Sequence, residues 1–432
     1  MKSTATLVMV SGPLLLVAAS TLAGCAPQEG APVAPTTAAS QERAVTEDRT
    51  SKWTLAVEPV STPADAGSTS PQITVEGGRT ILSWLEPTES RTTLKFAEWS
   101  GSGWSEAHIV ASGSDLVVNS ADVPSVRALT DGTLVAHWLQ EDGPDPEAYK
   151  LPLSWSKDGG RTWSRPMYPH HDGTKTQHGF ASLFQAPGAG LGLVWLDGRA
   201  TNAKEPDAPD SNMGLWAAVY GPDGKQVSEK AVDVRVCECC STSVAATSEG
   251  VIVAYRGRTA EEIRDIYVTR FDGRQWSAPA LVHNDGWEID GCPVNGPAVD
   301  ARGREVAVAW FTAKTDKGQA FAAFSHDGGR TFGQPIRIDD QTSLGQVNIT
   351  LLADGAAAVS FLEAGNRSEF RVRRVEQNGT RSPVVTIASF FGMQHPRLAQ
   401  SRNELLFAWT EYGQDGSPRV RTARASLGAV SK

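Results

Sequence analysis

The fold is decided by an eight-residue stretch that the chain carries twice, as Ser156-Lys157-Asp158-Gly159-Gly160-Arg161-Thr162-Trp163 and as Ser325-His326-Asp327-Gly328-Gly329-Arg330-Thr331-Phe332. In each copy the aspartate can accept hydrogen bonds from turn amides, and the glycines allow the positive φ that a tight turn needs. The final aromatic side chain can pack into the protein body. We therefore predict two structural turns of one kind, formed by Ser156, Asp158, Gly160, Thr162, Trp163, Ser325, Asp327, Gly329, Thr331 and Phe332. We do not expect either aspartate to be catalytic.

A second pattern repeats along the chain: a short strand-like run that ends in an aromatic residue. These aromatic residues stand 48 to 60 positions apart, at Trp84, Trp138, Trp195, Tyr255, Trp310, Phe361 and Trp409. An apolar run precedes each of them, and strand candidates follow. Four strands in a repeat of about 50 residues are typical of a propeller blade. The predicted fold is therefore all-β, a β-propeller with seven four-stranded blades by repeat count.

The two ends of this array are incomplete. One strand candidate, Arg419–Ala425, follows the last aromatic residue, and a lone run, Trp53–Val60, precedes the first blade. Pairing of these two segments would complete the last blade and cover an exposed sheet edge. We predict that the ring closes in this way.

The doubled stretch fits the pattern Ser-x-Asp-x-Gly-x-Thr-Trp/Phe, and by it the chain resembles the sialidase-like family of Asp-box (BNR-repeat) propellers. The resemblance implies a propeller and, as the alternative blade number, the six blades of sialidases. It also implies an alternative activity, that of an exo-α-sialidase or another glycoside hydrolase. Sialidases hold the substrate carboxylate with three converging arginines and use a Tyr–Glu pair with an acidic residue. Their early Arg-Ile-Pro motif is absent, and the nearest string here is Arg337-Ile338-Asp339.

The candidate site residues follow the repeat aromatics, in loops on the face opposite the doubled turns. Arginine side chains can bind a carboxylate through two parallel hydrogen bonds, and two segments that contain arginine, 195–199 and 255–258, lie in neighbouring blades. By the resemblance, a tyrosine beside a glutamate would be the nucleophile. The candidate catalytic residues are Asp197, Arg199, Tyr255, Arg256, Arg258, Glu411 and Tyr412. A solvated rim of loops is the alternative interpretation of these charges.

Cysteines and histidines precede the first strands of several blades, and we expect them near one mouth of the central channel: Cys237, Cys239, Cys240, Cys292, His178 and His395. Three interpretations stay open. Disulfides suit an exported protein, a thiolate–imidazole set suits Zn or Cu(I) as cofactor, and a redox-active thiol pair is the third. Because a bridge between the adjacent Cys239 and Cys240 would be strained, we predict at least one disulfide from the Cys237–Cys240 group to Cys292.

The N-terminus has the features of an export signal. Lys2 precedes an apolar stretch, and small residues lead to Leu22-Ala23-Gly24-Cys25. This string resembles the bacterial lipobox, in which the cysteine is lipidated; an ordinary secretory signal with a chance cysteine is the alternative. We predict a signal peptide over 1–24, a lipidated Cys25 with a flexible tether over 25–51, and one propeller domain over 52–430. By resemblance, Ala26 favours anchoring in the outer membrane of the cell envelope, on its periplasmic side or at the cell surface.

Charge narrows the range of partners. The net charge is −9 and the chain carries no basic run, which argues against a nucleic-acid partner. The expected partners are the membrane, through the lipid, and a small-molecule or glycan ligand. We therefore expect an envelope lipoprotein that binds a ligand, a glycan or a carboxylate-bearing molecule, at the channel mouth. A glycoside hydrolase and a metal- or thiol-redox-handling protein are the alternatives.

Overall fold

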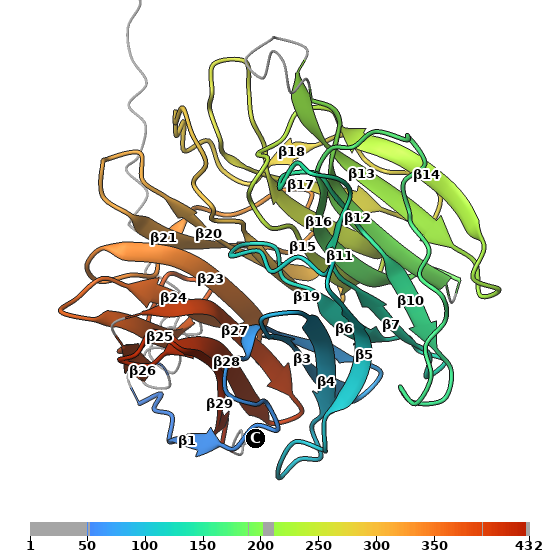
Figure 1. Cartoon of the computed structure of the whole chain (residues 1–432). Coiled ribbons are helices and arrows are strands. Elements are labelled where there is room, and N and C mark those ends of the chain that lie inside the picture. The colour runs from blue at the N-terminus through green and yellow to red at the C-terminus, as the bar shows by residue number, and fades with distance from the viewer. Residues whose placement is uncertain (1–49, 51, 189, 202–210, 391, 429–432) are drawn as a thin grey trace, which may run out of the picture. The chain divides into compact units, whose positions relative to one another are not determined.

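The computed structural model describes residues 50, 52–188, 190–201, 211–390 and 392–428. The predicted signal peptide, Cys25 and nearly all of the predicted tether lie outside these residues. The described part of the chain folds into antiparallel sheets that we number as blades 1 to 7 in chain order (Figure 1). Within the described residues, no helix is long and apolar enough to span a membrane.

Blades 1 to 3 have the following strands. Blade 1 contains β2 (Thr69–Glu76), β3 (Arg79–Pro87), β4 (Thr92–Glu98) and β5 (His108–Gly113). Blade 2 contains β6 (Ser125–Ala128), β7 (Leu134–His137) and β10 (Leu153–Ser156), with a bridge from Leu153 to Met167 in place of a fourth strand. A small ribbon, β8 (Gln140–Glu141) and β9 (Tyr149–Lys150), projects from it. Blade 3 contains β11 (His178–Ala186), β12 (Gly190–Ala200), β13 (Asn212–Tyr220) and β14 (Gln226–Asp233).

Blades 4 to 7 continue this order. Blade 4 contains β15 (Ser243–Thr247), β16 (Gly250–Arg256), β17 (Ile266–Phe271) and β18 (Ala280–Leu281). Blade 5 contains β19 (Ala298–Arg302), β20 (Glu305–Thr312), β21 (Gln319–Ser325) and β22 (Ile336–Arg337). Blade 6 contains β23 (Ser343–Leu351), β24 (Ala357–Glu363), β25 (Ser368–Val375) and β26 (Val385–Phe390). Blade 7 contains β27 (Met393–Ser401), β28 (Glu404–Tyr412), β29 (Pro418–Ser426) and β1 (Val57–Val60).

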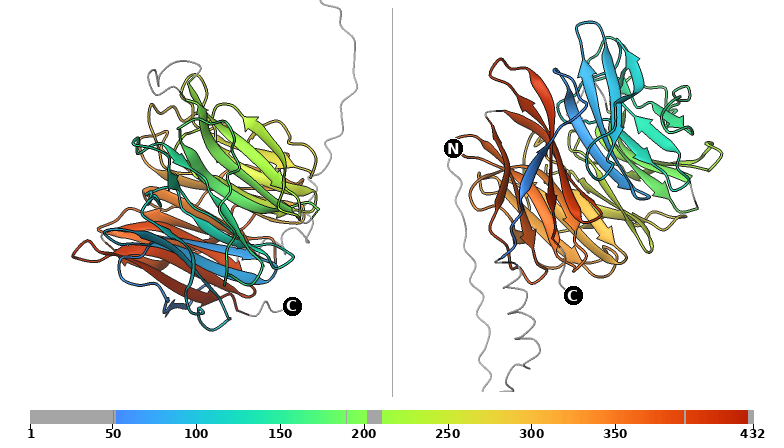
Figure 2. Two further views of the ribbon diagram at one scale, coloured as in Figure 1. Left: turned by 45° about the vertical axis from the view of Figure 1, so that its right-hand side comes forward. Right: turned by 90° about the horizontal axis from the view of Figure 1, so that it is seen from below.

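The first strands of the blades lie on the inside of a ring, as the views in Figures 1 and 2 show. Along this ring β2 contacts β6 and β27, β23 contacts β19 and β27, and β15 contacts β11 and β19. The predicted seven-bladed propeller is thus confirmed, and the alternative of six blades is wrong.

The repeat aromatics hold neighbouring blades together. Seven clusters of buried apolar side chains lie one between each pair of adjacent blades, and each contains one repeat aromatic. Trp195 and Trp310, for example, are both completely buried in their clusters. A buried aromatic side chain removes about 150–250 Å² of surface from water, so the repeat places one large apolar anchor in every interface.

The ring closes through its two ends. β1 pairs antiparallel with β29, with Val57 opposite Ala425 and Val60 opposite Thr422, and so becomes the outer strand of blade 7. Trp53 and Leu55 pack against the apolar cluster between blades 6 and 7. The closure predicted from the sequence is confirmed.

The doubled turns connect the third strand of blades 2 and 5 to the outer edge of the blade. Asp158 accepts hydrogen bonds from the Thr162 amide (2.9 Å) and hydroxyl (2.6 Å), and Asp327 accepts the same bonds from Thr331 (3.0 and 2.6 Å). The Thr162 hydroxyl and amide lower the pKa of Asp158. At Asp327 burial opposes the shift, but the bonds from Thr331 prevail and the pKa is again lowered.

Each doubled turn also fits against the preceding blade. Gly160 has a φ of 87°, and a Cβ there would lie 2.4 Å from the Phe96 ring. Gly329, with a φ of 78°, would meet Ile252 at 2.2 Å. The glycine is therefore required both by the backbone conformation and by the close approach of the preceding blade.

Candidate functional site

The channel mouth holds a small cavity on the face opposite the doubled turns. Its walls come from the segments that lead into the inner strands of blades 2, 4 and 5 and from the inner strands of blades 6 and 7. The lining residues are Ser120, Ala121, Cys239, Ser241, Val294, Asn295, Gly296, Gln346, Val347, His395 and Arg397. Of the cysteines and histidines predicted at the channel mouth, Cys239 and His395 line this cavity.

Two inner-strand bulges shape this cavity. The register of β23 shifts between Gly345 and Asn348, and that of β27 shifts between Gln394 and Arg397. Gln346 and His395 lie in these bulges with φ values of 54° and 53°. The inner strands of blades 1 and 3 have the same bulge, with φ values of 54° at Ser70 and 53° at Phe180. The bulge is therefore a repeated feature of the propeller, and in blades 6 and 7 it places Gln346 and His395 at the cavity.

Arg397 is the principal charge in the cavity. Its Nη1 donates to the Pro396 carbonyl at 3.1 Å, and its buried Nε has no hydrogen-bond partner among the described residues. Nor does any carboxylate of the described residues form an ion pair with it. Burial lowers the pKa of Arg397 to about 10, so the side chain stays cationic at neutral pH. An unpaired guanidinium in a recess favours an anionic ligand.

His395 connects two parts of the cavity wall through hydrogen bonds. Its Nε2 lies 2.8 Å from the Ser120 carbonyl, and its Nδ1 lies 3.5 Å from the Thr410 hydroxyl. Burial, together with the positive charge of Arg397, lowers the pKa of His395 to about 3. The neutral ring thus links blade 7 to the segment before blade 2, and with both nitrogens engaged it offers no lone pair to a metal ion.

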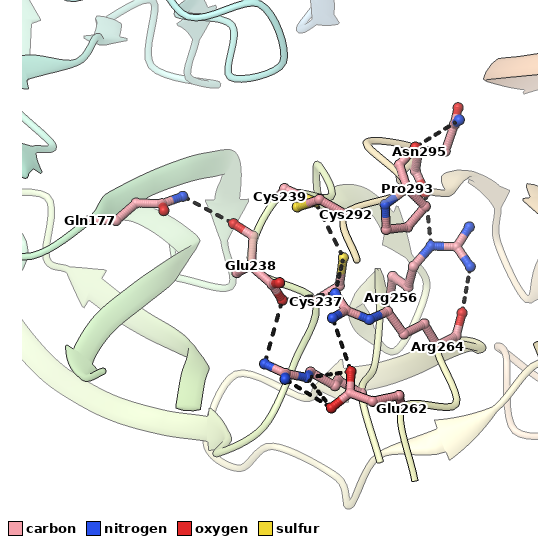
Figure 3. Close-up of a disulfide and its surroundings, with 11 residues drawn as sticks. Gln177, Cys237, Glu238, Cys239, Arg256, Glu262, Arg264, Cys292, Pro293 and Asn295 are labelled. Atoms are coloured by element: carbon pink, nitrogen blue, oxygen red, sulfur yellow. Dashed lines mark hydrogen bonds and ion pairs between the residues drawn. A yellow bond between two sulfur atoms is a disulfide. The ribbon is translucent and has the colours of Figure 1, made fainter. Parts of the chain in front are cut away.

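Cys239 and Cys292 form a disulfide that joins the segments before blades 4 and 5 (Figure 3). The predicted bridge from the Cys237–Cys240 group to Cys292 is confirmed. Cys237 and Cys240 remain buried free thiols, so this form has one disulfide and not two. Cys237, Cys239 and Cys240 bring their sulfur atoms within 4.8 Å of one another. A three-thiolate Zn or Cu(I) site would require reduction of the disulfide, and neither predicted histidine belongs to this group.

The predicted arginine clamp does not assemble. Arg256 is buried and donates to three backbone carbonyls, those of Asn295 (2.9 Å), Arg264 (2.5 Å) and Phe311 (2.7 Å). Arg258 pairs with Glu262 at 2.8 Å. Both guanidiniums already donate to partners within the protein and are therefore unsuited to binding a substrate carboxylate.

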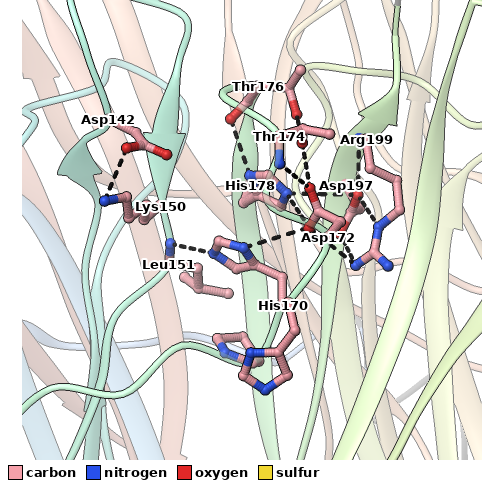
Figure 4. A network of polar contacts seen from close by, with 12 residues as sticks. Asp142, Lys150, Leu151, His170, Asp172, Thr174, Thr176, His178, Asp197 and Arg199 are labelled. Atoms are coloured by element: carbon pink, nitrogen blue, oxygen red, sulfur yellow. Dashed lines mark hydrogen bonds and ion pairs between the residues drawn. The ribbon is translucent and has the colours of Figure 1, made fainter.

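Asp197 and Arg199 belong to a different polar cluster (Figure 4). Asp197 accepts a hydrogen bond from the Trp195 indole at 2.7 Å and is completely buried. Arg199 contacts Asp197 at 2.8 Å and Glu229 at 2.6 Å, and its guanidinium lies 3.5 Å from the centre of the Trp216 ring. A carboxylate two residues after the tryptophan therefore satisfies the buried indole, which is a structural role.

The predicted tyrosines and Glu411 also have local partners. Tyr255 is buried and donates to Asp233 at 2.7 Å; burial and this carboxylate raise its pKa far above the usual range. Tyr412 donates to Gln394 at 2.8 Å, and Glu411 pairs with Arg421 at 2.9 Å. A tyrosine whose ionised form is disfavoured is a poor nucleophile.

Sequence reasoning named His178 but missed the histidine that stacks on it beside Asp197, His170 (Figure 4). The rings of His170 and His178 lie 3.8 Å apart and nearly parallel. Asp172 approaches His178 Nε2 at 3.1 Å and His170 Nδ1 at 3.7 Å. The only sequence signal was the His170-His171-Asp172 string, which has no strand periodicity.

Hydrogen bonds within the protein fix the orientation of both histidine rings. His178 Nδ1 lies 3.0 Å from the Thr176 carbonyl, and His170 Nε2 accepts from the Leu151 amide at 3.3 Å. Because a carbonyl can only accept, His178 donates from Nδ1 to Thr176. His170 accepts at Nε2 and so carries its proton on Nδ1, the nitrogen that faces Asp172. Burial and the neighbouring His178 lower the pKa of His170 to about 4. The cluster holds three potential metal-ligand atoms within 4.8 Å, but Arg199 already neutralises part of its charge.

Known protein structures share the fold of this chain at low sequence identity. No protein-family model matches the chain, and no curated protein matches it. The BP39L lectin from Burkholderia pseudomallei is similar with a TM-score of 0.59 at 11% identity, over 84% of this chain and 97% of that one. The polysaccharide lyase Uly1 gives 0.52 at 11% identity over 83% and 90%. The phage phi92 endosialidase gives 0.50 at 8% identity over 88% and 70%. The resemblance to sialidase-like and related propellers is confirmed at the level of the fold.

Proposed function

We propose that the channel-mouth cavity binds a carboxylate-bearing saccharide. The observation that carries the proposal is Arg397, a cation without a carboxylate partner among the described residues, in a recess lined by polar groups. A guanidinium can hold a carboxylate through two parallel hydrogen bonds. Asn295, Ser241 and Gln346 line the same recess and supply polar groups suited to hydroxyls. Lectins and polysaccharide lyases with this fold make saccharides the first class to test, by analogy of fold alone.

Binding can be measured by calorimetry on a panel of uronic and sialic acid glycans with their neutral counterparts. We expect the wild type to bind an acidic glycan, and Arg397→Gln to weaken binding at least tenfold, because Arg397 is the only charge without a carboxylate partner among the described residues that line the recess. Arg397→Lys should bind more tightly than Arg397→Gln but less tightly than the wild type, since lysine keeps the positive charge but cannot form the two parallel hydrogen bonds of a guanidinium.

Arg419→Gln is the matched control. Arg419 is an exposed arginine of the same blade, on β29, and its replacement should leave binding unchanged. Equal affinity of the wild type and Arg397→Gln, or an equal preference for neutral glycans, would refute the proposal.

We also propose that the protein acts from the cell envelope as a lipoprotein anchored through Cys25. The support is the string Leu22-Ala23-Gly24-Cys25. Cells that express the wild type and are fed a labelled fatty acid should incorporate the label into the protein, and Cys25→Ala should abolish it. Label in the Cys25→Ala protein would refute lipidation at this residue, and Cys240→Ala is the control for loss of a cysteine elsewhere.

A further inference from the structure

The four cysteines near the channel mouth differ in their exposure to solvent. Cys292 is exposed and Cys239 is half-buried, whereas Cys237 and Cys240 are buried. The free Cys237 Sγ lies 3.8 Å from Cys239 Sγ, which is one end of the disulfide. Cys239 also lines the cavity. A reduced sulfur thus adjoins the disulfide (Figure 3), and the far member of that disulfide, Cys292, is an exposed residue.

The surroundings of Cys237 favour its thiolate. The buried Arg264 directs Nη1 at Cys237 Sγ (3.6 Å) while its other contacts go to Glu238 and Glu262. Burial raises the pKa of Cys237, but hydrogen bonds from the Cys240 thiol and the Cys239 amide, with the charge of Arg256, lower it overall. Burial raises the pKa of Cys240, which therefore remains a thiol that can donate to Cys237. Adjacent positive charge is the usual means by which proteins activate a cysteine.

We propose that Cys237, Cys239 and Cys292 form a thiol–disulfide exchange site. The Cys237 thiolate attacks Cys239 Sγ, a Cys237–Cys239 bond forms, the Cys239–Cys292 bond breaks, and its electron pair leaves on Cys292. The step exchanges one disulfide for another, so it requires no oxidant. The proton lost by Cys237 is matched by one that the Cys292 thiolate can take from water.

The direction of attack follows from access and solvation. Cys237 contacts the inner sulfur of the bridge, and the outer sulfur is the better leaving group because water solvates its thiolate. The released Cys292 faces solvent, where it can attack a second disulfide of low molecular weight. In that step a mixed disulfide forms on Cys292, and one thiolate of the external disulfide leaves. The activity lies beyond saccharide binding and does not depend on it.

Native trapping tests this exchange on the folded full-length chain. The protein is incubated with iodoacetamide at pH 8 without denaturant, then denatured, and its remaining thiols are marked with a second reagent before peptide mapping. The exchange predicts time-dependent alkylation of Cys292, a disulfide between Cys237 and Cys239, and the second label on Cys240. A static bridge with two inert thiols predicts no native label on Cys292.

Two cysteine variants form a matched pair. Cys237→Ser should slow the alkylation of Cys292 at least tenfold, whereas Cys240→Ser should retain it within a few-fold. With glutathione disulfide as the probe, the wild type should acquire a glutathionyl adduct on Cys292, and Cys237→Ser should not. The wild-type peptide map is decisive even if a variant fails to fold. Absence of native label on Cys292, or its appearance together with label on Cys240 through unfolding, would overturn the proposal.

Discussion

At the residue scale, His137 shows how burial couples stability to pH. The side chain lies in β7, is almost completely buried, and has no hydrogen-bond partner for either ring nitrogen among the described residues. Burial lowers its pKa to about 4 from an ordinary value of 6.5. Between these two values the unfolded chain binds a proton that the folded protein does not. Stability therefore falls as the pH is lowered through this window.

Replacement of His137 by Leu should remove this dependence. The wild type should lose about 2 kcal/mol between pH 7 and pH 5 through this residue alone, and the variant should lose correspondingly less in urea unfolding at the two pH values. His171→Leu is the control, since that side chain is exposed and contacts the uncharged Gln226, and this variant should keep the loss that His137 causes. Identical pH dependence of His137→Leu and the wild type would show that the imidazole is not buried uncharged.

At the scale of elements, the doubled turns stabilise the outer edges of blades 2 and 5. Asp158→Ala removes three acceptor contacts, with Ser156 and with the amide and hydroxyl of Thr162. We expect a fall in Tm on the order of 2 °C, a similar fall for Asp327→Ala, and unchanged ligand binding, because the turns lie on the face opposite the cavity.

The acid dependence of this effect has a definite sign. Because the pKa of Asp158 is lowered in the fold, its contribution is present above its unfolded pKa of about 4 and is lost as the pH falls further. The difference in Tm between Asp158→Ala and the wild type should shrink in acid. Lys157→Ala, at the exposed neighbouring position, is the control and should leave the Tm unchanged. If Asp158→Ala lost ligand binding without losing stability, the functional face would lie at the turns instead.

At the scale of the whole molecule, one short strand closes the ring. A variant that begins at Thr50 keeps β1 and the Thr50 hydroxyl contact to Glu376 (2.8 Å). A variant that begins at Ser61 leaves β29 as an open edge and uncovers the apolar cluster between blades 6 and 7. The second should melt at least about 5 °C below the first, by circular dichroism at equal concentration. Equal melting temperatures would mean that β1 is not part of the closure.

Local and periodic features of this fold were open to prediction from the sequence. The doubled turns are made by residues within eight positions of one another, so the sequence predicts them. The repeat aromatics recur once per blade, so their number predicts the number of blades and leaves two end segments to close the ring. Cys239 and Cys292 were also predictable as partners, because both precede the first strands of adjacent blades. These statements depend on spacing along the chain, which the sequence states directly.

Tertiary structure alone decided which charges are free. Arg256 looked like a ligand-binding residue, but carbonyls of Asn295 and Phe311, 39 and 55 positions away, occupy its guanidinium. Arg397 stood out in no motif, yet it is the arginine left without a carboxylate partner among the described residues of the cavity. The physical reason is that a buried charge must find its partners in space, and in a ring of blades those partners come from segments whose distance along the chain says nothing about contact.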